Sequence, residues 1–335
     1  ARGYDNLINV NGGFAAIRTA DIKKALPMRE AIEVMRETFA QAHHGRAVMP
    51  VRMGLPTRDG IALFMPAYLP DANALGQKTV SVFAGNAARG LPTIHALVTL
   101  MDAQTGAPLA VLEGGYLTRL RTGAVTGLAC DVLAAPDAAT LTIIGAGGQA
   151  PTQIEAVCAV RPIRKVNIVS RGDRAQKLAA ELQAADASRE FIPQNFDGFD
   201  CLTQADIIVT ATTSRQPLFA GDGVKPGAVV AAIGAYTPEM REVDAALLNR
   251  SRVFVDDREA ALAEAGDLLI PARAGDWALE NIVCDLGALV CGHPQAHHDP
   301  RGVAFFKSCG LAIEDVACAK FVYDKLTEDE RRRTI

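Results

Sequence analysis

The sequence predicts an α/β protein of two domains, and three features of the chain support this prediction. First, a β-branched run at 141–144 leads into a glycine-rich turn at 145–148 and then into a helical pattern, which is the order of a dinucleotide-binding turn. Second, short apolar runs follow at 206–212, 227–234 and 252–256, as expected for parallel strands covered on both faces. Third, the turn lies in the middle of a chain of 335 residues, so another domain must precede it.

The glycine turn has the pattern that binds the pyrophosphate of a dinucleotide. Gly145 would allow the tight turn, Gly147 the close approach of a phosphate, and Ala150 the packing of helix against strand. The helix expected over 149–160 would point its N-terminus at the pyrophosphate. A glycine turn without a ligand is the alternative, because such a pattern alone has low specificity.

The end of the next expected strand predicts NADP(H) as the preferred cofactor, with NAD(H) possible. An NAD enzyme usually carries Asp or Glu at this place to bind the ribose 2′-hydroxyl, whereas this chain has Ser170, Arg171 and Arg174. A guanidinium group matches a 2′-phosphate, and a carboxylate would repel it. Asp173, the nearby acidic residue, is interpreted as the N-cap of a helix over 174–185.

Composition indicates a soluble globular enzyme. Hydrophobic residues make up 49% of the chain, charged residues 21%, and the formal net charge is -4, which makes nucleic acid an unsuitable partner. No apolar run reaches the roughly 18 residues of a membrane span. The seven cysteines are scattered without a CxxC pair, which fits reduced thiols and predicts a cytoplasmic location.

The first domain is expected to be α+β, with a helix followed by an antiparallel sheet. Ile32, Met35 and Phe39 lie at helical spacing. Turn clusters such as 102–106 separate the apolar runs that follow, as an antiparallel sheet requires. The expected strands are 48–55, 61–68, 75–83, 94–101 and 108–112.

Two helices are expected to connect the domains. A helix over 117–134 is rich in small residues and would bridge the domains by close packing, and a last helix near 311–325 would return to the first domain. The predicted domains are therefore 1–125 with 305–335, and 126–304 for the dinucleotide-binding domain.

Three cations of the first domain lie in apolar or glycine-rich surroundings. Strand parity puts Lys78 on the same face as Val80 and Val82, so its ammonium group needs an anion or a route to solvent; snorkelling at a strand end is the simpler alternative. Arg52 lies in an apolar run and Arg121 in the small-residue helix. A single arginine is more often a surface residue, but the three together predict a pocket for a carboxylate.

The chain resembles the ornithine cyclodeaminase and mu-crystallin family. The resemblance rests on four motifs in order along the chain, 76–83 (GQKTVSVF), 119–124 (RLRTGA), 144–150 (IGAGGQA) and 306–315 (FKSCGLAIED). It implies a homodimer in which the sheet of the first domain forms the subunit interface. The first domain would also form the base of the substrate site, and a Rossmann domain would close over that site. It also implies that Arg52, Lys78 and Arg121 hold a substrate carboxylate near the nicotinamide, with Tyr236 as a further substrate contact.

The expected cofactor contacts combine the glycine turn, the ends of the parallel strands, where ligands bind in such sheets, and positions that the family motifs imply. They are Thr93, Arg121, Gly145, Ala146, Gly147, Gly148, Gln149, Ser170, Arg171, Arg174, Thr210, Ala211, Thr212, Ile233, Gly234, Lys307 and Ser308.

One departure within the family narrows the expected reaction. Cyclodeaminases and the related archaeal alanine dehydrogenases carry an Asp where this chain has Tyr236. Ornithine cyclisation needs a base that works near neutrality, and an ordinary phenol ionises only near pH 10. Reduction of a preformed cyclic ketimine needs less: a bound carboxylate, a protonated C=N bond and a hydride donor. The leading hypothesis is therefore NAD(P)H-dependent reduction of Δ1-pyrroline-2-carboxylate to L-proline, with Δ1-piperideine-2-carboxylate as a possible second substrate, and with Lys78 as the residue that relays the proton.

Three alternatives stay open. Two of them are enzymes, an ornithine cyclodeaminase and an alanine dehydrogenase. The third is a protein that binds NADPH and a ligand in the manner of mu-crystallin. A metal site is not predicted: Cys291, His293, His297 and His298 could hold zinc, but the glycine and proline around them favour an exposed loop.

Overall fold

The computed structural model describes residues 8–10, 13–196, 200–296, 299 and 301–334. The chain divides into two compact units, residues 1–121 with 311–335, and residues 122–310. Each unit is described by itself. Within the described residues, no helix is both long and apolar enough to cross a membrane.

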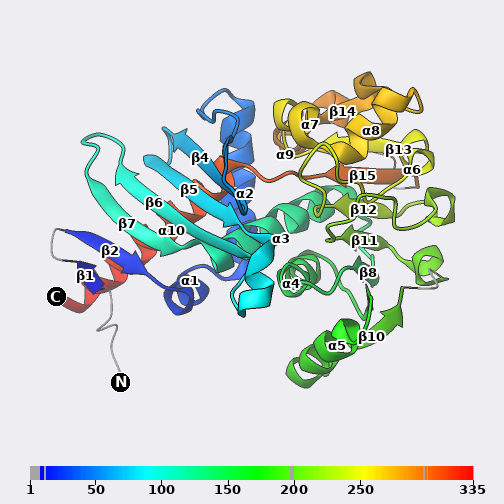
Figure 1. The fold of residues 1–335 in the computed structure, drawn as a ribbon, viewed down its shortest axis with the longest axis horizontal. Helices are drawn as coiled ribbons and strands as arrows, with labels where there is room; N and C mark the ends of the chain where they lie inside the picture. Colours follow the sequence, from blue (N-terminus) through cyan, green and yellow to red (C-terminus); the bar gives the residue numbers. More distant parts are fainter. Residues whose placement is uncertain (1–7, 11–12, 197–199, 297–298, 300, 335) are drawn as a thin grey trace. The chain divides into compact units, whose positions relative to one another are not determined.

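The first unit contains a seven-stranded sheet and the helices that cover it (Figure 1). Its strand order is β1-β2-β7-β6-β5-β4-β3, and neighbouring strands are antiparallel except for β2 and β7. The strands are β1 (Ile8–Val10), β2 (Phe14–Ile17), β3 (Met53–Pro56), β4 (Ile61–Leu69), β5 (Ala74–Val82), β6 (Ile94–Asp102) and β7 (Pro108–Glu113). The helices are α1 (Thr19–Ala25), α2 (Met28–His43), the short η1 (Ala84–Arg89) and α10 (Ala312–Thr334).

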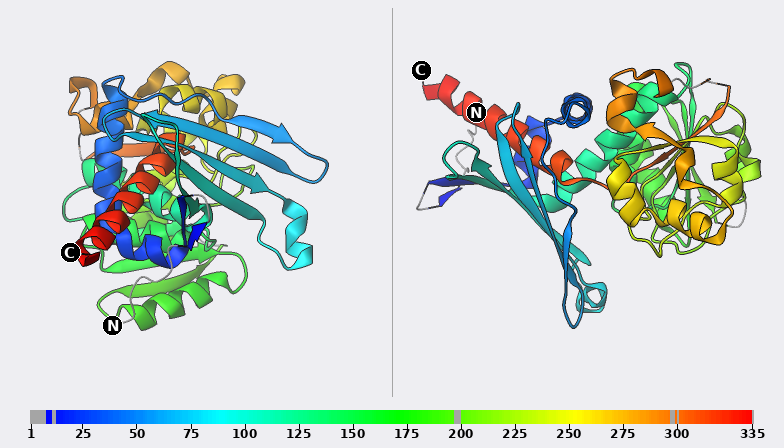
Figure 2. Two further views of the ribbon diagram at one scale, coloured as in Figure 1. Left: turned by 90° about the vertical axis from the view of Figure 1, so that its left-hand side faces the viewer. Right: turned by 90° about the horizontal axis from the view of Figure 1, so that it is seen from above.

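Side chains of the long strands alternate between the two faces of this sheet. Met65, Ala67 and Leu69 of β4 are buried, on the side where α10 contacts β4, β5 and β6; Figure 2 shows α2 and α10 packed beside each other. On the other face, Met53 and Leu97 are more than half exposed. The sequence therefore predicted the antiparallel core of the sheet, but it missed β1 and β2. The strand expected over 48–55 is β3, which starts at Met53.

The second unit is built on an eight-stranded sheet in which every pairing is parallel. Its order is β10-β9-β8-β11-β12-β15-β13-β14, so the chain changes direction along the sheet between β8 and β11, at the switch point where such sheets bind dinucleotides. The strands are β8 (Thr140–Ile144), β9 (Lys165–Ser170), β10 (Glu190–Asn195), β11 (Ile207–Thr210), β12 (Val229–Ala232), β13 (Ser251–Val255), β14 (Ile282–Asp285) and β15 (Val303–Lys307).

Helices and short turns connect these strands. The α-helices are α4 (Ala150–Val160), α5 (Arg174–Ala185), α6 (Ala245–Asn249), α7 (Arg258–Glu264), α8 (Gly266–Ala274) and α9 (Leu286–Val290), with 3-10 turns η2 (Asp200–Gln204), η3 (Gly221–Gly223), η4 (Leu279–Asn281) and η5 (Pro294–Ala296). Helix α3 (Gly114–Leu133) contains the boundary between the two units.

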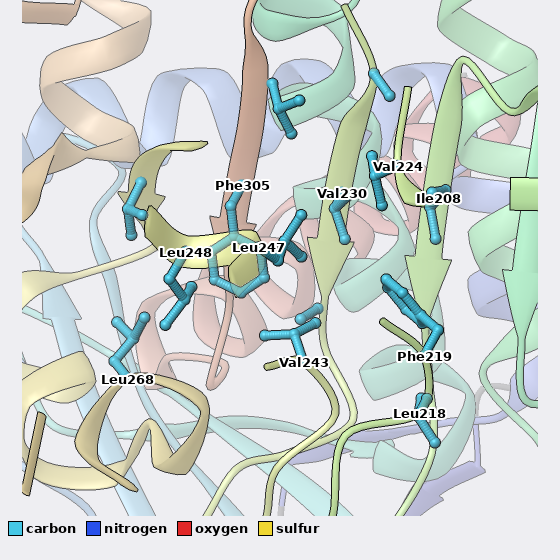
Figure 3. Close-up of a cluster of buried hydrophobic side chains, with 14 of the residues drawn as sticks. Ile208, Leu218, Phe219, Val224, Val230, Val243, Leu247, Leu248, Leu268 and Phe305 are labelled. Carbon is cyan, nitrogen blue, oxygen red and sulfur yellow. The ribbon is translucent and has the colours of Figure 1, made fainter. Parts of the chain in front are cut away.

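The core of the second unit explains why its strands are continuous apolar runs. Val230, Ile208 and Phe305 are fully buried, and Figure 3 shows them packed with residues such as Leu247 and Leu268. Phe305 belongs to β15, which lies between β12 and β13. The predicted domain boundary at 304/305 would divide this central strand. The second unit continues to Gly310 and contains the whole of β15.

Candidate functional site

The first unit holds a buried group of four charged side chains, which we call the four-charge cluster: Lys78, Arg121, Glu314 and Asp315. Lys78 pairs with Met65 and Val98 in the sheet register, and both of these neighbours are buried. Its side chain is only 3% exposed, and its Nζ lies 2.6 Å from Oδ2 of Asp315. Lys78 therefore does point to the apolar face, as strand parity predicts, and it reaches an anion there rather than solvent.

Arg121 completes the four-charge cluster from α3. Its Nη1 lies 2.5 Å from Oε2 of Glu314, and its Nε lies 3.1 Å from Oδ1 of Asp315. Asp315 therefore bridges the two cations, one with each oxygen. The backbone N–H of Leu311 donates to Oε1 of Glu314 at 2.9 Å, which fixes this carboxylate at the start of α10. Two positive and two negative side chains therefore face one another inside the protein, and the net charge of the four-charge cluster is zero.

The surroundings change the acidity of both cations. Burial and the positive charge of Arg121 lower the pKa of Lys78 to about 8, although Asp315 partly opposes this change. Burial alone would lower the pKa of Arg121, but the carboxylates of Asp315 and Glu314 outweigh it and raise that pKa. Arg121 is therefore a permanent cation, whereas Lys78 can give up a proton near neutral pH.

Sequence reasoning did not assign a role to Glu314 and Asp315, although both lie in the last of the four motifs. Their signal was an acidic pair at the beginning of a helix whose next turn, 316–319 (VACA), is apolar, a position that also suits the helix dipole. Both side chains are fully buried, and buried acidic residues need partners.

Two further residues predicted for the site lie elsewhere in the first unit. Arg52 is half-buried in the segment before β3, and Thr93 is exposed just before β6. The carbonyl of Thr93 accepts a hydrogen bond from the backbone N–H of Phe83. Their contacts with substrate and cofactor stay predictions.

In the second unit, the glycine turn has the geometry that a dinucleotide requires. Gly145 has a φ of +110°, and a Cβ there would lie 2.5 Å from the carbonyl oxygen of Ala211, so only glycine fits. Gly147 is exposed, and a Cβ on it would meet nothing within 4 Å, which leaves open space for a phosphate. Among the described residues, Oε1 of Gln149 and Oγ1 of Thr210 are buried without a hydrogen-bond partner. These features fit a bound dinucleotide.

The end of β9 differs from the expectation in one detail. Helix α5 covers 174–185 as predicted, but the side chain of Asp173 makes no capping hydrogen bond. Its Oδ2 instead lies 2.7 Å from Nζ of Lys177, which lowers the pKa of Asp173. Arg171 is exposed, and its guanidinium carbon lies 4.9 Å from the centre of the Phe196 ring. Ser170 is buried.

The loops that follow β11 and β12 are held together by a carboxylate that the sequence did not reveal. Glu242 is fully buried and accepts hydrogen bonds from Thr212, Gly234 and Ala235. Tyr236, the predicted substrate contact, is half-buried directly after these residues. The other expected contacts of this edge and of the glycine turn, Ala146, Gly148, Ala211 and Ile233, lie in the same loops.

The end of β15 places two expected cofactor contacts inside the protein. The Nζ of Lys307 lies 3.1 Å from Oδ2 of Asp267 and donates to the carbonyl of Ala232, so this ammonium group is engaged internally. Ser308 is buried, and its backbone N–H also donates to Ala232. Within the described part of the chain, no three His, Cys, Asp or Glu residues are placed to hold a metal ion. His297 and His298, considered for zinc, lie outside the described residues.

Comparison with known proteins identifies the family. The model of the ornithine cyclodeaminase/mu-crystallin family matches residues 15–330. The chain is 37% identical over 310 residues to a Δ1-pyrroline-2-carboxylate reductase of Bacillus cereus (strain ZK / E33L), a match that covers 91% of this chain and 94% of that protein.

Two solved structures are also similar. The Δ1-pyrroline-2-carboxylate reductase of Thermococcus litoralis, in complex with NADH and L-proline, superimposes with a TM-score of 0.89 at 35% identity, covering 94% of this chain and 98% of that one. An archaeal alanine dehydrogenase dimer with bound NAD gives a TM-score of 0.85 at 31% identity, covering 95% and 97%. With its family motifs, its two-sheet α/β fold and its Rossmann-type second unit, the chain belongs to the ornithine cyclodeaminase/mu-crystallin family.

Proposed function

We propose that this protein is an NAD(P)H-dependent reductase of cyclic ketimine carboxylates, which converts Δ1-pyrroline-2-carboxylate to L-proline and also accepts Δ1-piperideine-2-carboxylate. The observation that carries the proposal is the four-charge cluster, which is buried and has no net charge. A protonated imine that bears a carboxylate is a zwitterion, so it can bind beside this cluster without leaving an unbalanced charge. The two reductases among the similar proteins support the same substrate class.

The substrate carboxylate would bind the remaining donors of Arg121. A guanidinium group has five N–H donors, of which Nε donates to Asp315 and Nη1 to Glu314. Arg52 would supply the second half of the clamp, and Tyr236 would contact the ring of the substrate. Bound carboxylate and fixed cations orient the C=N bond, which is the main contribution that a protein makes to a hydride transfer.

Lys78 would donate the proton. Lys78 would pass its proton to the imine nitrogen, which forms the N–H bond of the zwitterion, and would regain a proton from solvent. When bound, the reduced nicotinamide would supply a hydride to the C=N carbon, so that the π electrons become the lone pair of the amine nitrogen and the cofactor is oxidised. A pKa of about 8 keeps Lys78 mostly protonated at neutral pH and still able to release its proton. Asp315 holds the ammonium group in place through its 2.6 Å contact.

The cofactor is proposed to be NADP(H) by preference. Arg171 is exposed at the end of β9, next to Arg174 at the start of α5, where a 2′-phosphate would bind. The ion pair with Lys177 engages the carboxylate of Asp173, which weakens its competition for a ribose hydroxyl. The similar solved structures hold NADH and NAD, so NAD(H) is retained as the second cofactor.

A homodimer is proposed through the open face of the first sheet. Met53, Leu55 and Leu97 are each more than half exposed, and the register of β3, β4, β5 and β6 puts all three on the face opposite to the buried residues of β4. Exposed apolar patches of this kind mark protein interfaces. The similar alanine dehydrogenase is a dimer.

The decisive experiment measures kcat/KM for both cyclic imines with NADPH and NADH, in the wild type and in Lys78→Met. Removal of a general acid is expected to lower kcat/KM by roughly 100-fold or more. Lys320→Met is the matched control, because Lys320 is partly exposed on α10 and pairs with Asp324. Full activity of Lys78→Met would overturn the proposal. Release of ammonia from ornithine with catalytic NAD would show a cyclodeaminase, and ligand binding without turnover would show a binding protein.

A further inference from the structure

A fully buried carboxylate, Glu242, connects the loops at the carboxyl ends of two neighbouring strands. Its Oε1 accepts hydrogen bonds from the backbone N–H and the hydroxyl of Thr212, at 2.7 and 2.8 Å. Its Oε2 accepts from the backbone N–H groups of Gly234 and Ala235, at 2.8 and 3.2 Å. Thr212 follows β11, and Gly234 follows β12. One side chain therefore fixes the distance between the two loops.

Two more buried charges hold Glu242 in place. Oδ1 of Asp267, in the first turn of α8, accepts from the backbone N–H groups of Glu242 and Val243 at 2.6 and 3.1 Å. Asp267 in turn pairs with Lys307 at the end of β15, and Lys307 donates to Ala232 at the end of β12. All three charged side chains have no exposed surface.

This arrangement is costly, which suggests that it serves more than folding. Burial and the charge of Asp267 raise the pKa of Glu242, and the charge of Lys307 and the hydrogen bonds from Thr212 oppose that change. The loops that it joins are also tightly packed: a Cβ on Gly234 would lie 2.1 Å from the carbonyl oxygen of Thr212. A fixed carboxylate behind two closely packed loops gives them a single arrangement.

We infer that Glu242 is a positioning residue for the nicotinamide half of the dinucleotide. The inference rests on the proposed function, in that it assumes a dinucleotide bound at the glycine turn. The pyrophosphate lies at that turn, next to the switch point between β8 and β11, so one half of the dinucleotide extends over β9 and the other over β11 and β12. The half over β9 is the adenosine half, because Arg171, the proposed contact of the 2′-phosphate, follows that strand. The loops at Thr212 and Gly234 then form the surface under the nicotinamide, and Glu242 acts through them without touching the ligand.

The test compares two ligands that differ only in the nicotinamide, NADPH and 2′-phospho-ADP-ribose, by isothermal titration calorimetry. In Glu242→Gln the amide group turns a donor toward backbone donors, and losing hydrogen bonds to a charged acceptor is expected to weaken NADPH binding roughly tenfold. Affinity for 2′-phospho-ADP-ribose should stay at the wild-type value, because this fragment does not reach the two loops. Glu239→Gln is the control, since Glu239 is exposed in the same segment and its replacement should change neither affinity.

A milder variant covers the case in which Glu242→Gln does not fold, which loss of both affinities would reveal. Thr212→Val removes one of the four hydrogen bonds to Glu242 and should weaken the binding of NADPH alone. Equal losses for both ligands in Thr212→Val, or an unchanged ratio of the two affinities in a folded Glu242→Gln, would overturn the inference. A wild-type protein that binds neither ligand would overturn the proposed function instead.

Discussion

Replacing Asp315 with asparagine is expected to move the alkaline limit of imine reduction to lower pH. Lys78 can donate a proton only while it is protonated, so kcat/KM should fall as the pH rises through its pKa of about 8. Burial and Arg121 lower this pKa, and the carboxylate of Asp315 opposes them from 2.6 Å. Without that carboxylate the two lowering effects act with less opposition, so the fall should begin at lower pH.

The size of the shift follows from the contact that is lost. A hydrogen bond between charged partners contributes about 1.5–3 kcal/mol, and one pKa unit corresponds to about 1.4 kcal/mol. The asparagine oxygen still accepts a neutral hydrogen bond, so part of the interaction remains and a shift of about one unit is expected. At pH 8 the variant would then keep about a tenth of its plateau activity, against about half for the wild type.

The assay is the initial rate of NADPH oxidation with Δ1-pyrroline-2-carboxylate, measured from about pH 6 to pH 10. Ionisation of the free imine affects every variant equally, so a difference between variants belongs to the protein. Asp324→Asn is the matched control, because Asp324 pairs with Lys320 on the same helix but is 48% exposed. An alkaline limb that stays in place or moves upward in Asp315→Asn would refute the assignment of the limb to Lys78.

Three further predictions concern the cofactor, the glycine turn and the open sheet face. Arg171→Asp should reverse the cofactor preference toward NADH, because a carboxylate repels the 2′-phosphate; an unchanged ratio of kcat/KM for the two cofactors would count against the role of Arg171. Gly145→Ala should abolish nucleotide binding and lower the free energy of unfolding by about 1–3 kcal/mol, seen by calorimetry and denaturant titration, because its φ of +110° and the nearby carbonyl of Ala211 leave no room for Cβ. Leu97→Glu, at a residue that is 54% exposed, should produce monomers in sedimentation velocity, and an intact dimer would exclude this face as the interface.

Local periodicity explains which parts of the site could be predicted from the sequence. The side-chain period of a strand is two residues, so the apolar neighbours of Lys78 determine the face on which it lies. Its partner Asp315 lies on a helix from the other end of the chain, and no local pattern reports such a contact. Arg121 was singled out because it is a cation in a helix rich in small residues, but its two carboxylate partners came only from the structure.

The second unit shows a similar limit. The glycine turn was predictable because phosphate binding demands particular residue types at fixed spacing, and the positive φ of Gly145 agrees with that demand. The place of β15 was not predicted, because a buried apolar run does not specify its neighbours in the sheet. Lys307 was expected to contact the cofactor because the family motif around it implied this. In the structure it pairs with Asp267, and its contact with the cofactor stays a prediction.

The charge balance of the four-charge cluster gives the substrate class a physical basis. If pyruvate bound there, its carboxylate would add one negative charge to a buried group whose charges already cancel, and the balance would return only after ammonia had added and the imine had been protonated. A cyclic imine arrives with its nitrogen already in place, so a single proton gives a zwitterion whose two charges face opposite partners. Since a buried charge without a partner is costly, we expect a free keto acid to bind more weakly than the protonated imine.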